Sequence, residues 1–276
     1  MQERPDYSKF IERLKMSEDE TRVESTKKRH SKKYRTAREN LIHLVDEDSF
    51  LEFGQFAVAA QRTRREKEDL ILNTNADGVI TGFCKINSDI SKKMNTDAVA
   101  IVYDYSVLAG TQGLFHHQKL DRIFEKAKTY KLPIVIFTEG GGGRPGDVDV
   151  LTQIAGMHIP SFANWASLHK ECLRIAITNG YCFAGNAALF GASDIRIATK
   201  GSNIGMAGPA MIEGGGLGKF SPDDIGAVED HLLNGVVDVL VENEEQATNI
   251  AKKILSYFQG SVDRFDSLDQ ELLKNI

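Results

Sequence analysis

The residues best suited to chemistry are four consecutive glycines, Gly140 to Gly143, which directly follow Thr138 and Glu139 and the apolar run 134–137. β-Branched and aromatic residues of this kind predict a buried strand. Glycines that end a strand leave several backbone N–H groups unobstructed, so a ligand can approach them closely. Such groups stabilise negative charge that develops on a substrate oxygen, as acyl transfer and enolate formation require. The alternative interpretation is a flexible turn that binds nothing.

Two nucleotide-binding motifs fit this loop poorly. The glycines between Gly141 and Gly146 have the spacing of the dinucleotide fingerprint, but the region about 20 residues further on, 161–165, lacks the acidic residue that binds a ribose. A phosphate-binding P-loop needs Ser or Thr after its Gly-Lys pair, and the pair at 218–219 is followed by Phe220. The sequence therefore favours an acyl or enolate oxygen over a nucleotide phosphate.

A second loop bordered by glycines follows another predicted strand. Residues 172–178 predict a strand, and 179–185 predict a tight loop before a short apolar helix over 186–190. Further strands are predicted at 79–86, 98–105, 193–198 and 236–241. Short strands that are each followed by a loop and a helix predict an α/β fold of stacked β-β-α turns with parallel sheets.

Helices and one further strand frame this core. Helices are predicted at 36–45, 114–130 and 244–255, a helix start at 147–151, a short strand at 50–54 and a turn at 74–78. Thr36, with Glu39 three residues on, has the pattern of a capping box. By contrast, 202–209 predicts an irregular turn rather than a strand. We expect a charged helical arm over 1–35, one domain over 36–260, and a C-terminal tail or linker over 261–276.

The composition argues against several classes of protein. The 276 residues are 41% hydrophobic and carry a net charge of −5, which gives no general attraction for nucleic acid. The apolar runs fall short of the ~20 residues of a membrane span, and the polar N-terminus does not predict a signal peptide. Cys84, Cys172 and Cys182 lack Cys-x-x-Cys spacing, so we expect no metal site, no disulfides and a cytoplasmic location. The basic run 27–35 predicts a solvated helix face, or else a surface for a phosphate-bearing ligand or an acidic partner.

The sequence contains few candidate side chains for a catalytic acid, base or nucleophile. The sequence contains neither a Gly-x-Ser-x-Gly elbow nor a His-Glu-x-x-His motif. Glu139 and Glu213 border glycine-rich segments and could imitate the paired carboxylates of a hydratase, with support of the loops as the alternative role. His116 and His117 stand at a predicted helix start, where they form either a neutral surface pair or a ligand contact.

Six motifs in order give the chain a resemblance to a known family. They are Lys28 to Phe50, Asp104 to Gly113 with His116 and Lys119, Gly141 to Arg144, Gly180 with Cys182 and Gly185, Gly208-Pro209, and Val236 to Asp238. Together they resemble the N-terminal domain of the carboxyltransferase of biotin-dependent acyl-CoA carboxylases of the acetyl-CoA and propionyl-CoA type. The resemblance implies a crotonase-like (ClpP/crotonase) spiral of β-β-α turns with an N-terminal helical segment packed outside it.

The resemblance also implies roles for the two loops. The amides of Gly141 and Gly142 would form an oxyanion hole for the acyl-CoA thioester, with the Phe183-Ala184-Gly185 backbone as a neighbouring wall or donor. Further substrate contacts are implied at Gly140, Gly143, Arg144, Gly113, His116 and Gly208. Because the first loop has one glycine more than the family pattern, the choice of donor amides stays open by one residue.

The resemblance to this family also implies a cofactor and partners. Biotin, as carboxybiotin on a carrier domain, would release CO2, and its ureido anion would take the α-proton of the acyl-CoA. The implied partners are a carboxyltransferase C-domain, a biotin carboxyl carrier and a biotin carboxylase module, in a homo-oligomer, with no nucleic acid and no membrane. Since the chain resembles only the acyl-CoA half, we expect no carboxyl transfer without a second half.

Three other functions stay open at the level of the sequence. They are a non-catalytic assembly or scaffold domain, a biotin-dependent acyl-CoA decarboxylase subunit, and a hydratase or decarboxylase that turns over without biotin. The sequence does not identify the acyl chain, because it does not place the residues that would limit its length.

Overall fold

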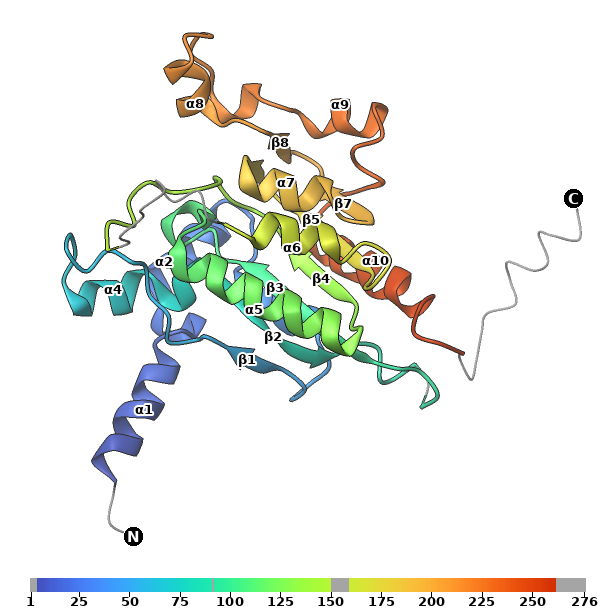
Figure 1. The fold of residues 1–276 in the computed structure, drawn as a ribbon, viewed down its shortest axis with the longest axis horizontal. Coiled ribbons are helices and arrows are strands. Elements are labelled where there is room, and N and C mark those ends of the chain that lie inside the picture. The colour runs from blue at the N-terminus through green and yellow to red at the C-terminus, as the bar shows by residue number, and fades with distance from the viewer. Residues whose placement is uncertain (1–3, 91, 150–158, 262–276) are drawn as a thin grey trace, which may run out of the picture.

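The main sheet of the protein has seven strands, most of them parallel (Figure 1). The computed structural model describes residues 4–90, 92–149 and 159–261. In order across the sheet, the strands are β1 (Leu51–Phe53), β2 (Val79–Lys85), β3 (Asp97–Tyr103), β4 (Ile134–Phe137), β5 (Arg174–Thr178), β7 (Ile195–Thr199) and β9 (Val239–Val241). β1, β2 and β3 pair antiparallel, and all neighbours from β3 to β9 are parallel. The expected α/β fold with a parallel sheet is confirmed.

The order of the strands separates this sheet from a dinucleotide-binding one. From β3 onward, each strand that joins the main sheet is added on the same side of the strand before it. A doubly wound sheet reverses direction instead, and its ligand binds at the reversal. Between these additions the chain leaves for a second sheet, where β6 (Tyr181–Phe183) pairs in parallel with β8 (Asn203–Gly205). The chain therefore alternates between two sheets as it advances, as a spiral does.

The strand β8 shows that the prediction of an irregular turn at 202–209 is wrong. Ile204 pairs with Cys182, and the N–H of Asn203 donates to the carbonyl of Gly180 at 3.0 Å. β6 likewise lies inside the segment predicted as a loop. Strands of three residues are too short to show an alternating pattern, so the partner strand decides their conformation.

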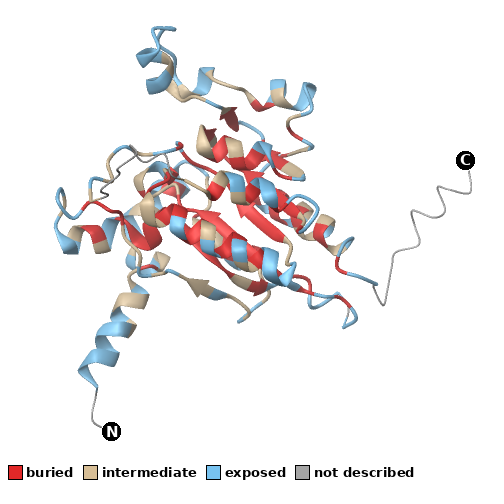
Figure 2. Ribbon diagram, in the orientation of Figure 1, coloured by how far each residue is buried: buried red, intermediate tan, exposed pale blue. Residues whose placement is uncertain are grey.

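Helices cover both faces of the main sheet. The α-helices of the described residues are α1 (Pro5–Lys15), α2 (Val23–Ser31), α3 (Ala37–Leu44), α4 (Lys67–Asn73), α5 (Leu114–Tyr130), α6 (Ser161–Ser167), α7 (Gly185–Gly191), α8 (Pro209–Gly214), α9 (Val228–Leu233) and α10 (Glu244–Ser256). α5, α6 and α7 contribute Leu120, Trp165 and Leu189 to the core on one face. α3 and α10 contribute Leu44 and Leu255 to the core on the other. Figure 2 shows the buried strands between these layers.

Side-chain caps decide where two helices begin. Thr36 accepts a hydrogen bond from the N–H of Glu39, and the Glu39 carboxylate accepts one from the N–H of Thr36, so the predicted capping box is confirmed at α3. The helix predicted to start at Asp147 does not form over 147–149, where residues 148 and 149 make a turn; residues 150 and 151 lie outside the described ranges. The Asp147 carboxylate instead accepts the N–H of Leu114 at 2.9 Å, at the start of α5. In the sequence, Asp147 predicts the start of a local helix, but in the structure it caps α5, which begins 33 residues earlier.

The N-terminal segment contains α1 and α2, separated by residues 16–22, and α1 projects away from the sheets (Figure 1). Its contact with the body includes Phe10, whose ring packs edge-on against that of Phe56 with 5.5 Å between centroids. Within the described ranges, no helix combines the length and the apolar character needed to cross a bilayer. Residues 262–276, most of the predicted tail, lie outside those ranges.

Candidate active site

The first glycine loop, which follows β4, is held by hydrogen bonds from two distant segments. The N–H of Gly141 donates to the carbonyl of Ala109 at 3.0 Å. The N–H of Gly142 donates to Oδ1 of Asn186 at 3.0 Å, and its carbonyl accepts the N–H of Gln112 at 2.7 Å. The two amides to which the family resemblance assigns the oxyanion hole therefore have acceptors inside the protein.

The second glycine loop forms an elbow between β6 and α7. Ala184 caps α7 with φ of 51° and ψ of −118°, a conformation that non-glycine residues rarely adopt. A sharp strand-to-helix turn of this kind carries the nucleophile in α/β-hydrolases, but Ala184 offers only a methyl group. An ideal Cβ on Gly142 would lie 2.6 Å from Cβ of Ala184, so the two loops touch and only glycine fits between them. Gly140 joins them as well, because its carbonyl accepts the N–H of Phe183 at 2.9 Å.

The amides of Gly143 and Gly185 have no acceptor within the described part of the chain. Among the described residues, a Cβ built on Gly143 meets no atom within 4 Å, and Gly143 is exposed, so it borders open space. The nitrogen of Gly185 lies 3.5 Å from the Cβ position of Gly142, the residue before Gly143. Unpaired N–H groups on two loops that touch are donors of the kind that can bind one oxygen and stabilise its negative charge.

Arg144 and His116, which were expected to contact substrate, have their side chains turned into the protein. The Arg144 guanidinium forms ion pairs with Asp147, at 2.7 Å, and with Asp77, and it donates to the carbonyl of Thr111 at 3.0 Å. The side chain of His116 is fully buried, with Nδ1 3.1 Å from the carbonyl oxygen of Asp77. As direct substrate contacts both stay predictions, whereas the contacts observed hold the first loop in place.

The remaining predicted contacts lie around the two loops. Gly113 precedes α5, and a Cβ there would collide with the side chains of Arg144 and Asp147. Gly208 precedes α8, and its Cβ position lies 3.6 Å from the ring of Phe183. Phe183 and Gly208 are therefore neighbours beside the elbow, while Gly113 is packed beneath the first loop.

His116 and His117 do not form the surface pair considered from the sequence, because both are buried. Nδ1 of His117 lies 3.0 Å from Oγ of Ser161, at the start of α6, which covers this turn of α5. Burial lowers the pKa of His117 from 6.5 to about 4 and lowers the pKa of His116 well below 6.5. Both imidazoles are therefore neutral near pH 7, and neither can donate a proton as an imidazolium there.

Glu139 is held in an ion pair directly before the four glycines. Its two oxygens accept hydrogen bonds from the guanidinium of Arg29, at 2.9 and 2.7 Å. Burial alone would lower the pKa of Arg29, but the carboxylate of Glu139 raises it overall. Glu213 is exposed on α8, where it pairs with Lys219 at 2.9 Å. The bidentate ion pair fastens α2 to the residue before the four glycines.

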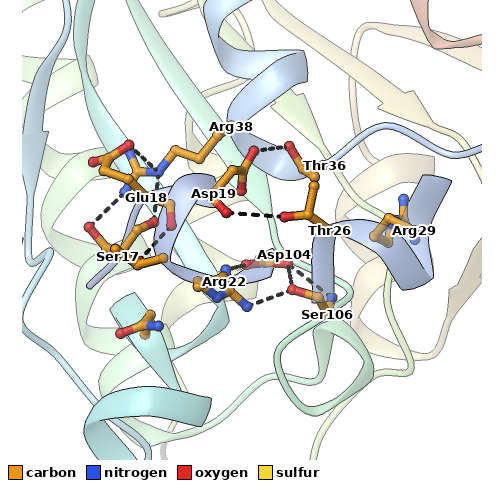
Figure 3. A network of polar contacts seen from close by, with 12 residues as sticks. Ser17, Glu18, Asp19, Arg22, Thr26, Arg29, Thr36, Arg38, Asp104 and Ser106 are labelled. Carbon is orange, nitrogen blue, oxygen red and sulfur yellow. Dashed lines mark hydrogen bonds and ion pairs between the residues drawn. The ribbon is translucent and has the colours of Figure 1, made fainter. Parts of the chain in front are cut away.

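A network of polar contacts joins the N-terminal segment to the turn beneath the first loop (Figure 3). Arg22 donates to Asp104 and to Ser106, each at 2.6 Å, just after the end of β3. The chain then enters a turn in which Leu108, Ala109 and Gly110 all have positive φ, of 48°, 55° and 62°. Left-handed conformations are costly for residues other than glycine, so surrounding contacts must maintain this turn. Its carbonyl at Ala109 is the one that accepts the amide of Gly141.

The sequence analysis did not single out Asn186 and Gln112, two residues that hold the loops. Asn186 is the one polar residue in the apolar segment 186–190, and that contrast was the available signal. A cavity of about 470 Å³ lies away from the loops, between α5 and the β1–β2 pair, with Phe53, Phe83 and Arg122 among its lining residues. In the part of the chain that the structure describes, no group of three His, Cys, Asp or Glu residues could hold a metal ion.

Solved structures with this arrangement are carboxyltransferases of the crotonase-like fold. A single-chain, multi-domain long-chain acyl-CoA carboxylase matches with a TM-score of 0.91 and 48% identity, over 96% of this chain and 26% of that one. The transcarboxylase 12S hexamer, crystallised with methylmalonyl-CoA and methylmalonic acid, matches with a TM-score of 0.70 and 27% identity, over 85% of this chain and 43% of that one. The crotonase-like fold implied by the sequence motifs is thus confirmed.

The chain belongs to the carboxyl transferase domain family, whose model matches residues 28–270. The methylmalonyl-CoA carboxyltransferase 12S subunit of Propionibacterium freudenreichii subsp. shermanii is 31% identical over 240 residues, which are 86% of this chain and 43% of that subunit. The acetyl-coenzyme A carboxylase carboxyl transferase subunit beta of Prochlorococcus marinus (strain MIT 9215) is 29% identical over 226 residues, 78% of this chain and 73% of that subunit. The chain therefore spans less than half of the 12S subunit.

Proposed function

We propose that this chain is the acyl-CoA-binding half of a biotin-dependent carboxyltransferase, and that the amides of Gly143 and Gly185 hold the thioester oxygen. The observation that carries this proposal is the pair of N–H groups without an acceptor in the described part of the chain, at the junction of two loops, whereas the amides of Gly140, Gly141 and Gly142 are bonded within the protein. Carboxylation next to a thioester passes through an enolate, and each donor aimed at its oxygen contributes about 3 kcal/mol in a site that excludes water. The family resemblance implied donors at Gly141 and Gly142. The proposed donor in the first loop is the next residue, Gly143, and the donor in the second loop is Gly185, which the resemblance also implied.

The elbow supports a reaction without a covalent intermediate on the protein. Ala184 occupies the position of a nucleophile but has no heteroatom, while Glu139 is paired with Arg29 and the two histidines beneath the loop are neutral. Burial and the lowered pKa values make both imidazoles weak bases that a substrate cannot reach, and Glu139 is held by its ion pair, so none of these side chains is suited to remove the α-proton of an acyl-CoA. Carboxybiotin, when bound, would supply both the CO2 and the proton acceptor. The residues of this chain then bind the thioester, orient it and stabilise the enolate oxygen.

A second carboxyltransferase half is the partner that this proposal requires. The segment 206–233, which includes α8 and α9, exposes several large apolar side chains; they are Met206, Met211, Leu217, Phe220, Leu232 and Leu233. Exposed apolar groups gathered on one segment mark a surface that another protein covers. This segment follows β8 and lies beside the elbow, since Gly208 contacts Phe183. A partner that covers it would close the acyl-CoA site from outside.

The test is carboxylation by the chain together with its complementary carboxyltransferase domain and a carboxylated biotin carrier. Palmitoyl-CoA, propionyl-CoA and acetyl-CoA are supplied in turn, and the carboxylated thioester is detected by mass spectrometry. Palmitoyl-CoA comes first because the relative that is 48% identical acts on long-chain acyl-CoA. Product that depends on the biotin carrier supports the proposal. Binding of acyl-CoA without product would favour an assembly domain, and turnover without biotin would favour a hydratase or simple decarboxylase.

A matched pair of alanine variants localises the site. Gly143→Ala places a methyl group in the open space where the thioester should lie, and we expect turnover to fall by about 10-fold or more, because small misplacements at a reacting centre are costly. Gly191→Ala, at the other end of α7, also meets no atom within 4 Å and should leave turnover unchanged. Equal activity of the two variants would place the acyl-CoA elsewhere.

A further inference from the structure

Asn186 lies where the two glycine loops meet, and its side chain is fully buried. Oδ1 accepts the N–H of Gly142 at 3.0 Å, and Nδ2 donates to the carbonyls of Thr138 at 3.1 Å and Gly110 at 3.3 Å. Only this orientation of the amide places its acceptor by a donor and its NH2 group by two acceptors. Three segments, 108–110, 138–142 and α7, are therefore tied together through one side chain.

These contacts fix the peptide that carries the amide of Gly143. Asn186 holds the nitrogen of Gly142, and Gln112 donates to the Gly142 carbonyl at 2.7 Å. In a trans peptide the carbonyl and the following N–H point in opposite directions. Because the Gly142 carbonyl faces Gln112, the N–H of Gly143 must point away from Gln112. The direction of this donor is thus determined by the two residues that hold Gly142.

Asn186 also follows Gly185 directly, so it belongs to the elbow that carries the second donor. We propose that Asn186 is a positioning residue that sets the distance and angle between the N–H groups of Gly143 and Gly185. This inference rests on the proposed function, and it adds a residue that does not touch the substrate. The side chain bridges the two loops from beneath, so a change there moves one donor relative to the other without filling the acyl-CoA site.

The experiment compares two substitutions of Asn186 with a control elsewhere. Asn186→Leu has a similar size but lacks the acceptor for Gly142 and the donor for Thr138 and Gly110. Asn186→Asp keeps the acceptor for Gly142. The control is Asn87→Ala, since Asn87 is also buried and donates to Lys252 and Gln259, remote from both loops. All three variants are assayed in the complete enzyme for kcat and KM, with palmitoyl-CoA as the varied substrate, and their melting temperatures are compared.

A positioning role predicts an effect on kcat rather than on substrate binding. We expect Asn186→Leu to lower kcat about 10-fold or more and to change KM less than about threefold, because misaligned donors weaken the transition state more than the bound substrate. Asn186→Asp should retain more activity than Asn186→Leu. Asn87→Ala should lower the melting temperature at unchanged kcat. If Asn186→Leu keeps a normal kcat, or loses kcat no more than Asn87→Ala at equal destabilisation, the inference is overturned.

A second measurement does not depend on turnover. In the unmodified chain, the amide proton of Gly142 should exchange slowly with solvent by NMR, because it is buried in a hydrogen bond. Exchange at Gly142 should accelerate in Asn186→Leu and stay slow in Asn87→Ala. Slow exchange in both variants would refute the tie between Asn186 and the loop. Absence of carboxylation by the unmodified enzyme would refute the proposed function instead, and the exchange rates would still decide whether Asn186 holds Gly142.

Discussion

Replacing Gly142 by alanine should destabilise the protein, whereas the same replacement at the next glycine, Gly143, should not. Gly142 has φ of 86°, and its Cβ position lies 2.6 Å from Cβ of Ala184. A left-handed conformation costs a non-glycine residue about 1–2 kcal/mol, and forcing an extra methyl into a packed site costs about 1–3 kcal/mol. Together they lower the free energy of unfolding by about 2–5 kcal/mol. At about 2–4 °C per kcal/mol for a chain of this size, the melting temperature should fall by at least about 4 °C.

Thermal unfolding followed by circular dichroism measures this effect, with Gly143→Ala and Gly191→Ala as controls. Both control positions lack a positive φ between 20° and 160° and have no atom within 4 Å of an added Cβ, so their melting temperatures should stay within about 1–2 °C of the unmodified chain. If Gly143→Ala lowers the melting temperature as much as Gly142→Ala, the two loops do not approach each other closely at Gly142.

Three further outcomes are expected from contacts away from the two free amides. Since burial holds the pKa of His117 at about 4 against 6.5 in the unfolded chain, the unfolded state binds more protons between these values, and stability should fall as pH is lowered from 6.5 to 4. Urea titrations at both pH values should show a smaller loss for His117→Asn than for the exposed control His169→Asn; equal losses would contradict the burial argument. Arg29→Met should lower the free energy of unfolding by about 3–5 kcal/mol, because it leaves Glu139 buried without its partner, and Glu139→Gln in the same chain should restore part of it. Thr36→Ala should cost about 1 kcal/mol through loss of the capping box, and an unchanged urea midpoint would argue against that cap.

Elements with a strong periodic pattern could be predicted closely from the sequence. The helix expected over 114–130 and the strand expected over 134–137 have the same bounds in α5 and β4. Their apolar residues repeat at the spacing of one face, or are uniformly buried, so local sequence and tertiary packing agree. The order of strand, loop and helix also indicated the spiral. β6 and β8 were missed because each has three residues beside glycines or polar residues, whereas the equally short β1 and β9 lie within longer apolar runs.

The site could be predicted only in part, because distant segments determine which amides are free. The four glycines identify the loop, but the acceptors for Gly141 and Gly142 come from Ala109 and Asn186, more than 30 residues away on either side. Similarly, nothing near Glu139 in the sequence indicates its ion pair with Arg29. Contacts of this kind depend on how the elements pack, and they decide whether a polar group faces the substrate or the protein.

The central claim is that Gly143 and Gly185 donate to the thioester oxygen. Infrared spectroscopy of palmitoyl-CoA labelled with carbon-13 at the thioester carbon, bound to the complete enzyme, tests it most directly, because hydrogen bonds to a carbonyl lower its stretching frequency. The bound carbonyl should absorb at a lower frequency than in water, and this shift should shrink in Asn186→Leu while remaining in Asn87→Ala. A bound carbonyl that absorbs as it does in water would contradict the assignment of the oxyanion hole to these two amides.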